Sequence, residues 1–291
     1  MGIQPRSIQS SMTRRKFLRL MAAAGAEVGA FALGGAYTIW AEPYWLSVER
    51  VTIPLTGLVD ALRGTTIAQI SDLHVGHFLG QKDIARAVDA VLGLRPSLIV
   101  VTGDYVTLAA EHAGLCAAEL VRLRAPLGVF LILGNHDHWT DARVVTRILR
   151  DAGLNLLINE GRLIESNGGA FWLAGVDDVW ERHVDLDAAL RGAPKDVPKI
   201  LLAHEPDYAD VVAADGRVSL QISGHSHGGQ VRLPFLGAPA LPYMATKYPF
   251  GLRRVGGMWL YTNRGIGVVA PPVRFNCRPE VTLFSLTADR S

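Results

Sequence analysis

Short apolar runs that end in polar residues recur along most of the chain. Five of them are four or five residues long and rich in valine, isoleucine and leucine: Ile67–Ile70, Leu98–Val101, Val129–Leu133, Ile200–Ala203 and Val218–Ile222. Runs of this length and β-branched content are typical of buried strands. Helix-like composition is found in Asp83–Leu92, Glu111–Leu123 and Asp141–Leu149. Strands alternating with helices predict an α/β fold whose right-handed crossovers place the helices outside the sheet.

The second half of the chain is richer in predicted strands and contains one proline-rich segment. Phe171–Ala174, Met258–Tyr261 and Val281–Leu286 are predicted to be strands of a second sheet. Leu233–Met244 has too many prolines for a regular helix or a central strand. Two interpretations of this segment stay open: an apolar rim that contacts a lipid tail, and a loop that packs over the core.

The N-terminus carries a basic motif followed by an apolar, Ala/Gly-rich stretch. Thr13-Arg14-Arg15-Lys16-Phe17-Leu18 precedes the run Leu20–Trp40, and the pattern resembles a bacterial twin-arginine signal. Glu27 inside the run disfavours a permanent anchor, because a carboxylate at the bilayer centre costs about 2.5–3.5 kcal/mol. Cleavage is favoured, but Ile39 is not the small residue of an Ala-x-Ala site, so an uncleaved tether stays open.

This motif predicts two segments and a location. Residues 1–41 are expected to be a twin-arginine-type signal or N-terminal membrane segment, and residues 42–291 a catalytic domain. Either way we expect the domain to be exported across the cytoplasmic membrane, to the periplasm or to the outer face of that membrane, with the twin-arginine export machinery as a partner. Membrane association through the N-terminal segment is one outcome.

Size, charge and cysteine content narrow the class of protein. Without residues 1–41, about 250 residues remain, which suits one α/β domain with a large core. The formal net charge of +2 includes the basic leader, so no basic track for nucleic acid is evident and a nuclease is disfavoured. The two cysteines, Cys116 and Cys277, do not form a disulfide framework.

Metal-binding residue types follow five of the predicted strands. They occur as Asp72-Leu73-His74, Gly103-Asp104, Gly134-Asn135-His136-Asp137, His204 and Gly224-His225-Ser226-His227. In α/β sheets the carboxyl ends of parallel strands lie at one edge, so these side chains can converge although they are distant in sequence. Carboxylates, imidazoles and an amide oxygen suit divalent ions such as Mn, Zn, Fe or Co. The order of the segments predicts a site for two divalent metal ions.

These segments resemble the calcineurin-like metallophosphoesterase superfamily, whose pattern is D-x-H, GD, GNH(D/E), H and GHxH, over about residues 65–230. The stretch after them is similar to a branch of exported bacterial phosphoesterases. The resemblance implies a four-layer αββα sandwich. It also implies that Asp72, His74 and His227 hold one metal, that Asn135, His204 and His225 hold the other, and that Asp104 bridges both.

The resemblance gives His136 a catalytic role beside the phosphate, where it protonates the leaving oxygen or stabilises the transition state. Asp137 could accept a hydrogen bond from His136 and fix its tautomer, or it could be an ordinary turn carboxylate. No arginine follows Gly103-Asp104, so Arg143, Arg232 or Arg264 could supply positive charge for the phosphate.

The expected function is an exported dinuclear-metal-dependent phosphoesterase that hydrolyses phosphodiester or pyrophosphate bonds through a metal-bridging hydroxide. A lipid or cell-envelope phosphoester is a candidate substrate. Some relatives of this branch cleave a diacylated UDP-sugar, but that substrate belongs to the cytoplasmic face, whereas the leader directs this domain outward. The alternative is a catalytically inactive exported metal-binding or envelope-binding protein on the same scaffold.

Overall fold

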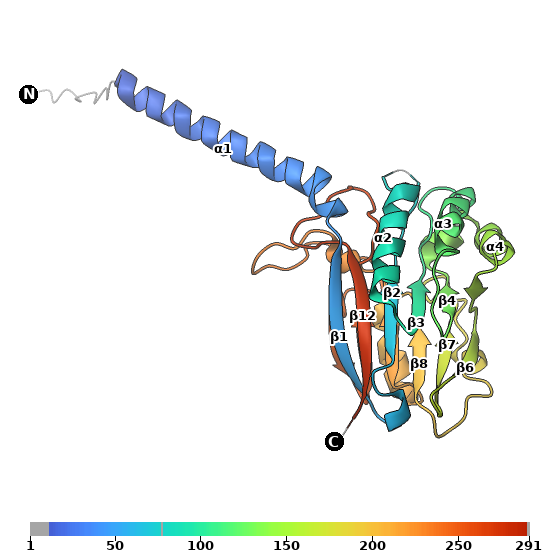
Figure 1. Ribbon diagram of the computed structural model, residues 1–291. Helices are drawn as coiled ribbons and strands as arrows, with labels where there is room; N and C mark the ends of the chain where they lie inside the picture. Colours follow the sequence, from blue (N-terminus) through green and yellow to red (C-terminus); the bar gives the residue numbers. More distant parts are fainter. Residues whose placement is uncertain (1–11, 77, 290–291) are drawn as a thin grey trace, which may run out of the picture.

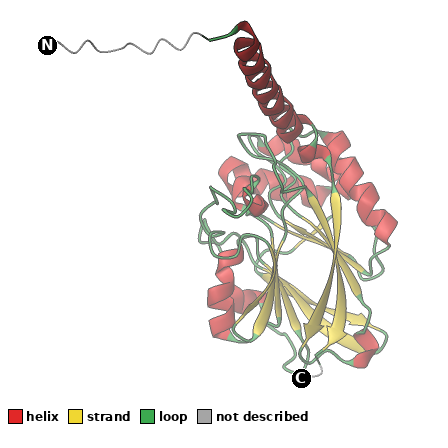
Figure 2. Ribbon diagram, turned by 90° about the vertical axis from the view of Figure 1, so that its left-hand side faces the viewer, coloured by secondary structure: helices red, strands yellow, loops and turns green. Residues whose placement is uncertain are grey.

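Two six-stranded sheets lie face to face, and helices cover their outer faces (Figure 1 and Figure 2). The computed structural model describes residues 12–289 except residue 77, so the first eleven residues of the predicted leader lie outside the described part. The layers confirm the predicted αββα sandwich.

The first sheet has the strand order β1-β12-β2-β3-β4-β5. Its strands are β1 (Ser47–Leu55), β2 (Thr66–Ile70), β3 (Leu98–Thr102), β4 (Val129–Ile132), β5 (Asn155–Leu156) and β12 (Glu280–Ala288). Strands β2 to β5 run parallel, whereas β12 is antiparallel to β2. The prediction that Val281–Leu286 belongs to the second sheet is therefore wrong. This mostly apolar run, interrupted by Thr282 and Ser285, fits a central strand of either sheet, so the local sequence does not distinguish between them.

The second sheet has the strand order β10-β11-β9-β8-β7-β6. Its strands are β6 (Glu160–Ser166), β7 (Gly169–Gly175), β8 (Lys199–Leu202), β9 (Leu220–Ser223), β10 (Gly251–Val255) and β11 (Met258–Thr262). The predicted strands at Phe171–Ala174 and Met258–Tyr261 are confirmed as parts of this sheet. Strands β7, β8, β9 and β11 are parallel to one another.

Helices α2 (Gln81–Leu94), α3 (Ala113–Leu120) and α4 (Asn135–Asp151) cover the first sheet, and α5 (Leu186–Ala189) and α6 (Ala209–Asp215) cover the second. The 3-10 turns are η1 (Glu42–Tyr44), η2 (Asp60–Leu62), η3 (Ala110–His112), η4 (Pro206–Tyr208) and η5 (His227–Gly229). Helix α4 starts at Asn135, before the predicted start at Asp141, where the backbone leaves the helical conformation (φ −172°).

Three apolar cores hold the layers together. Strand β3 shows the arrangement: Leu98 and Val100 pack between the sheets, whereas Ile99 and Val101 pack against the helices. All four side chains are fully buried. Burial on both faces explains the uninterrupted apolar sequence of this strand. Each such side chain contributes about 1.5–3 kcal/mol through the hydrophobic effect.

Helix α1 (Arg14–Trp40) projects away from the domain (Figure 1). None of its residues is buried. Its 27 residues span about 40 Å, more than the hydrocarbon thickness of a bilayer. The helix is long and apolar enough to cross a membrane, a test that signal sequences also pass. Its last turn is attached to the domain, because the Arg274 N–H donates a 2.9 Å hydrogen bond to the Thr38 carbonyl oxygen.

Candidate metal centre

The polar residues predicted to bind metal lie together at one end of the two facing sheets. Asp72, Asp104 and Asn135 follow strands of the first sheet, and His204 and His225 follow strands of the second. Backbone hydrogen bonds of 3.0 Å tie the loops together, from Asp72 N–H to the Gly103 carbonyl and from Gly224 N–H to the His204 carbonyl. The site therefore depends on both sheets keeping their relative position.

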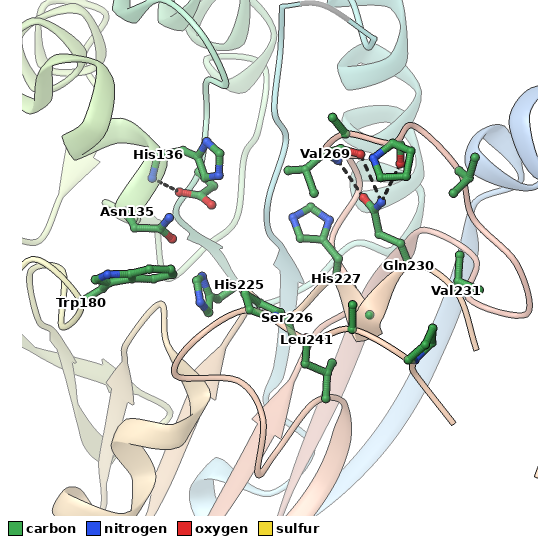
Figure 3. A pocket seen from close by; sticks show the side chains of 18 of the residues that line it. Asn135, His136, Trp180, His225, Ser226, His227, Gln230, Val231, Leu241 and Val269 are labelled. Atoms are coloured by element: carbon green, nitrogen blue, oxygen red, sulfur yellow. Dashed lines mark hydrogen bonds between the residues drawn. The ribbon is translucent and has the colours of Figure 1, made fainter. Parts of the chain in front are cut away.

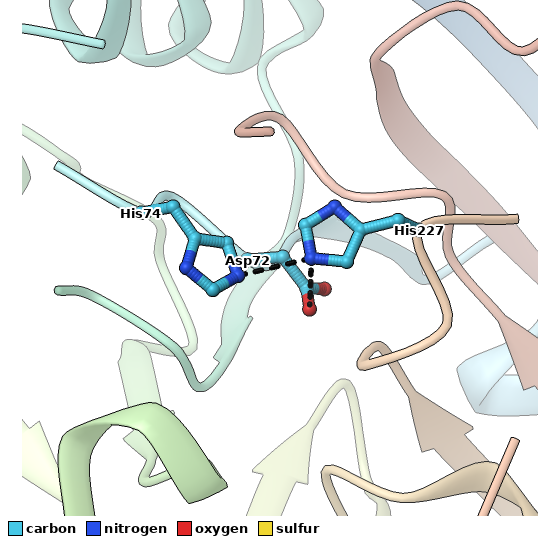
Figure 4. A group of neighbouring side chains, drawn as sticks. All are labelled: Asp72, His74 and His227. Atoms are coloured by element: carbon cyan, nitrogen blue, oxygen red, sulfur yellow. Dashed lines mark hydrogen bonds and ion pairs between the residues drawn. The ribbon is translucent and has the colours of Figure 1, made fainter. Parts of the chain in front are cut away.

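The first cluster contains Asp72, His74 and His227, whose ligand atoms all lie within 4.8 Å of one another (Figure 4). The Nε2 atoms of the two imidazoles are 2.9 Å apart, and His227 Nε2 lies 3.5 Å from Asp72 Oδ1. His74 Nδ1 lies 3.2 Å from the Thr107 hydroxyl, which can fix this ring. The facing nitrogens and the carboxylate form a donor set that a divalent cation fits.

The second cluster contains Asp104, His204 and His225. His204 Nδ1 donates to the Thr102 carbonyl at 2.6 Å, and His225 Nε2 donates to the Tyr243 carbonyl at 2.7 Å. A carbonyl only accepts, so each ring keeps its other nitrogen as a lone-pair donor for a metal. This pairing of a metal-facing nitrogen with a backbone carbonyl is typical of metal-binding histidines.

Asp104 connects the second cluster, to which it belongs, with the first. Its Oδ2 is 3.1 Å from His204 Nε2 in the second cluster and 3.4 Å from His74 Nε2 in the first. The buried Asn135 Oδ1 accepts no hydrogen bond from the residues that the structure describes. A buried polar atom without a partner is costly, so this oxygen also fits a metal-binding role.

Five of the seven candidate ligands have left-handed backbone conformations. Their φ angles are 52° for Asp72, 47° for His74, 56° for Asp104, 68° for His225 and 49° for His227. Each such conformation costs about 1–3 kcal/mol in a residue other than glycine and is often found at functional sites. The concentration of this strain at one place supports a functional origin.

Burial and mutual charges control the protonation of the site. Burial lowers the pKa of His74 and of His225 to about 3, so both rings are neutral at pH 7 and can offer lone pairs. Burial, together with the charge of Asp104, raises the pKa of Asp72 to about 7. Burial opposes protonation of His204, but the charges of Asp104 and Asp72 outweigh it and hold that pKa well above its usual value. A bound cation would supply the positive charge that this carboxylate-rich set requires.

Asp137 does not contact His136 in the way that the sequence suggested. Its carboxylate accepts hydrogen bonds from the N–H groups of Gly134, Asp104 and Tyr105 at 2.9–3.0 Å. The reason is its position in the first turn of α4, where a carboxylate faces back toward free backbone N–H groups. The predicted hydrogen bond from His136 is therefore wrong, and Asp137 organises the metal-bearing loops.

Replacing Asp137 with asparagine is expected to lower the free energy of unfolding by about 2–3 kcal/mol, because an amide N–H₂ would face backbone donors. Urea unfolding of the metal-free chain measures this change. Asp60→Asn, at an exposed carboxylate, should change it by less than about 0.5 kcal/mol. Unchanged stability with abolished turnover would instead make Asp137 catalytic.

His136 lies next to both clusters, at the start of α4 (Figure 3). Its backbone N–H donates to Asp104 Oδ1 at 2.9 Å, and its ring centre is 4.7 Å from that of His74. His136 Nδ1 has no hydrogen-bond partner among the described residues. The imidazole is thus held beside the candidate ligands with a nitrogen free for another group.

A cavity of about 500 Å³ opens directly onto these residues (Figure 3). Beside Asp104, Asn135 and three histidines, most of its wall is apolar, formed by Trp139, Trp180, Val231, Pro239, Ala240, Leu241, Pro242, Val269, Ala270, Pro271 and Val273. The proline-rich segment Leu233–Met244 therefore contributes a cavity wall. The sequence did not point to Trp139, Trp180 or Val269 as site residues, because apolar residues in a sequence do not distinguish a cavity wall from a core.

The three arginines proposed to contact phosphate lie elsewhere. Arg264 is paired with Glu280 and Glu49, and the Arg232 guanidinium lies 3.5 Å from the ring centre of Phe250. Arg143 lines a separate hollow beside α4. No lysine or arginine lines the cavity within the described residues 12–76 and 78–289. The expectation that these arginines supply charge to the phosphate is not met.

Comparison with known proteins agrees with this geometry. The family model described as calcineurin-like phosphoesterase matches residues 65–229. The chain is 34% identical to the uncharacterized metallophosphoesterase YkuE of Bacillus subtilis, over 94% of this chain and 98% of the relative. It is 31% identical to phosphodiesterase YaeI of Escherichia coli, over 94% and 99%. A Danio rerio transmembrane protein with a metallophosphoesterase domain is 30% identical, over 81% of this chain and 56% of that protein. The chain therefore belongs to the calcineurin-like phosphoesterase family and is a metal-dependent phosphoester hydrolase.

Proposed function

We propose that this hydrolase acts on phosphodiester or pyrophosphate bonds of a lipid-like envelope substrate, outside the cytoplasm. The observation that carries the proposal is the cavity that joins the candidate metal ligands to a largely apolar wall. Pockets that bind apolar groups have such walls with a few polar groups that fix orientation. The polar end would take the phosphate and the apolar end an acyl or prenyl chain.

In this proposal the site would hold two divalent ions. Asp72, His74 and His227 would hold one, Asn135, His204 and His225 would hold the other, and Asp104 would be shared. Bound ions would supply Lewis acidity for the phosphate oxygens and for the attacking water. Mn, Zn, Fe and Co all suit the mixed oxygen and nitrogen donors.

His136 acts on the substrate in the proposal. Its side chain lines the cavity next to Asp104 and His225, where a phosphate held by the clusters would lie. A proton on the imidazole could pass to the leaving oxygen as the phosphorus–oxygen bond breaks, or stabilise charge on a non-bridging oxygen. The backbone hydrogen bond from His136 to Asp104 fixes the distance between this ring and the clusters.

The location proposed for the reaction rests on the N-terminal segment. Arg14 and Arg15 begin a solvent-exposed helix that could span a bilayer, and the positive end is retained on the cytoplasmic side. The 42–291 segment would then face outward, as a domain that is either released or tethered. The name of the zebrafish relative, a transmembrane protein, is consistent with a membrane location for this family.

The test compares hydrolysis of bis(p-nitrophenyl) phosphate and of a diacylated phosphodiester in detergent micelles by full-length protein. Stripping the metals should abolish both activities, and reloading with Mn, Co or Zn should restore them. Restored cleavage of the small diester alone would contradict the lipid-like substrate. A metal-loaded chain without turnover on either substrate would favour the inactive binding-protein alternative.

Leu241→Asp is expected to separate the two substrates, because it places a carboxylate in the apolar wall without touching a candidate ligand. A diacylated substrate that loses its contact with this leucine is expected to show a decrease in kcat/KM of about tenfold or more. The small diester should be cleaved at nearly the original rate. Val211→Asp, at an exposed position on α6 outside the cavity, is the matched control. Equal losses for both substrates would contradict a chain-binding role of this wall.

A further inference from the structure

One surface turn exposes large apolar side chains beside the cavity. Leu233 and Gly237 are joined by hydrogen bonds of 2.9 Å in both directions between their backbones, which closes a turn, here called the 233–237 turn. At its tip Phe235 is 107% exposed and Leu236 is 82% exposed. Two adjacent exposed apolar residues on a tip are costly in water and indicate a contact surface.

The 233–237 turn is attached to the foot of α1. Arg232, directly before the turn, donates its N–H to the Phe275 carbonyl at 2.8 Å. The neighbouring Arg274 donates its N–H to Thr38, in the last turn of α1. Arg274 and Phe275 therefore connect the turn with the helix. Figure 1 shows an orange loop, the colour of residues near 235, next to the foot of α1.

The foot of α1 has the residues of a membrane–water interface. Trp40, Tyr44 and Trp45 are 71%, 40% and 55% exposed, respectively, and none of them belongs to a core. Arg278 lies 4.1 Å from the ring centre of Trp45. Tryptophan and tyrosine gather where a spanning helix leaves the bilayer, and arginines there can reach lipid headgroups. The arrangement fits a bilayer surface at the level of these residues.

We infer that the 233–237 turn is a second membrane contact, which inserts Phe235 and Leu236 into the outer leaflet beside α1. The occupant of this surface is a lipid bilayer, and the inference rests on the tethered form of the proposed function, in which α1 stays in the membrane. The cavity lies between the 233–237 turn and α1. Two residues of its wall, Val231 and Val273, directly precede Arg232 and Arg274, whose backbone hydrogen bonds join the turn to the helix. Its apolar end therefore faces the leaflet, and a lipid substrate can enter from the bilayer without crossing water.

The test uses full-length protein reconstituted in vesicles of equal parts phosphatidylethanolamine and phosphatidylglycerol. An environment-sensitive fluorophore is attached at Phe235→Cys, at Phe31→Cys on α1, and at Leu163→Cys on β6, the opposite edge of the second sheet from β10. The two native cysteines are buried. Quenching by spin-labelled lipid and by aqueous iodide is then compared.

We expect lipid quenching at the Phe235 and Phe31 positions and iodide quenching at the Leu163 position. A Phe235 probe that iodide quenches as strongly as the Leu163 probe would overturn the inference, whether or not the Phe31 probe is protected. The quenching assay does not depend on turnover. It therefore tests the membrane contact even if the proposed hydrolysis of a lipid-like substrate is wrong.

A second measurement uses Phe235→Asp combined with Leu236→Asp, with Leu163→Asp as control. Cleavage of a diacylated phosphodiester in these vesicles should fall at least fivefold, while cleavage of bis(p-nitrophenyl) phosphate stays unchanged. Unchanged cleavage in vesicles would contradict entry of substrate past this turn. Loss of both activities would also contradict it, because the turn lies outside the cavity wall.

Discussion

Asp104→Asn is expected to remove both metals at once and to lower kcat/KM by roughly a thousandfold or more, about 4 kcal/mol in transition-state stabilisation. The reason is the position of this carboxylate, because Asp104 Oδ2 lies 3.1 Å from His204 Nε2 and 3.4 Å from His74 Nε2. An amide of the same shape retains the fold but loses the negative charge that two cations share. Metal content by mass spectrometry and cleavage of bis(p-nitrophenyl) phosphate measure the effect.

Two controls make the Asp104 result specific. Asp60→Asn removes an exposed carboxylate far from the site and should leave metal content and turnover unchanged. Asp72→Asn should weaken the first cluster more than the second, because Asp72 lies 3.5 Å from His227 but 3.9 Å from His204. Retention of one full equivalent of metal by Asp104→Asn would contradict its place between two ions.

His136→Ala is expected to lower kcat by about 10²–10⁴ and to leave the metal content unchanged. The side chain lines the cavity, and its ring lies within ligand distance of His74 and Asp104. We nevertheless assign it to the substrate, because the resemblance leaves this histidine out of both sets of metal ligands. Loss of a proton donor should slow an alkyl phosphodiester more than a p-nitrophenyl ester, whose leaving group needs no proton. Turnover of metal-loaded protein on both substrates measures this difference.

His138→Gln is the matched control for His136. It lies two residues along the same helix, but its Nε2 is bound to Asp177 at 2.8 Å, and it does not line the cavity. Its kcat should stay within a factor of about two, as is usual for substitutions away from the reacting groups. Full activity of metal-replete His136→Ala would refute the catalytic role of this histidine.

Strand positions and ligand types were predictable because they depend on local sequence. The apolar run Leu98–Val101 forms a strand wherever both of its faces are covered, and Asp104 follows it after a tight glycine turn. The fixed order of the aspartate, asparagine and histidine segments indicated a metal site, and its resemblance to the calcineurin-like phosphoesterases implied metal-assisted phosphoester hydrolysis. These properties depend on spacing and side-chain type, and both are present in the chain before it folds.

Other properties depend on contacts between distant segments, and only the tertiary structure decided them. Strand β12 joins the first sheet although its sequence fits either one, and Asp137 binds backbone N–H groups in a loop that the sequence places more than thirty residues away. Arg264 is neutralised by Glu49, a residue 215 positions earlier in the chain. The sequence by itself determined which residues can bind metals and where strands form. The tertiary structure decided how two sheets bring those residues to one point, because non-local packing sets side-chain partners, backbone strain and the apolar cavity.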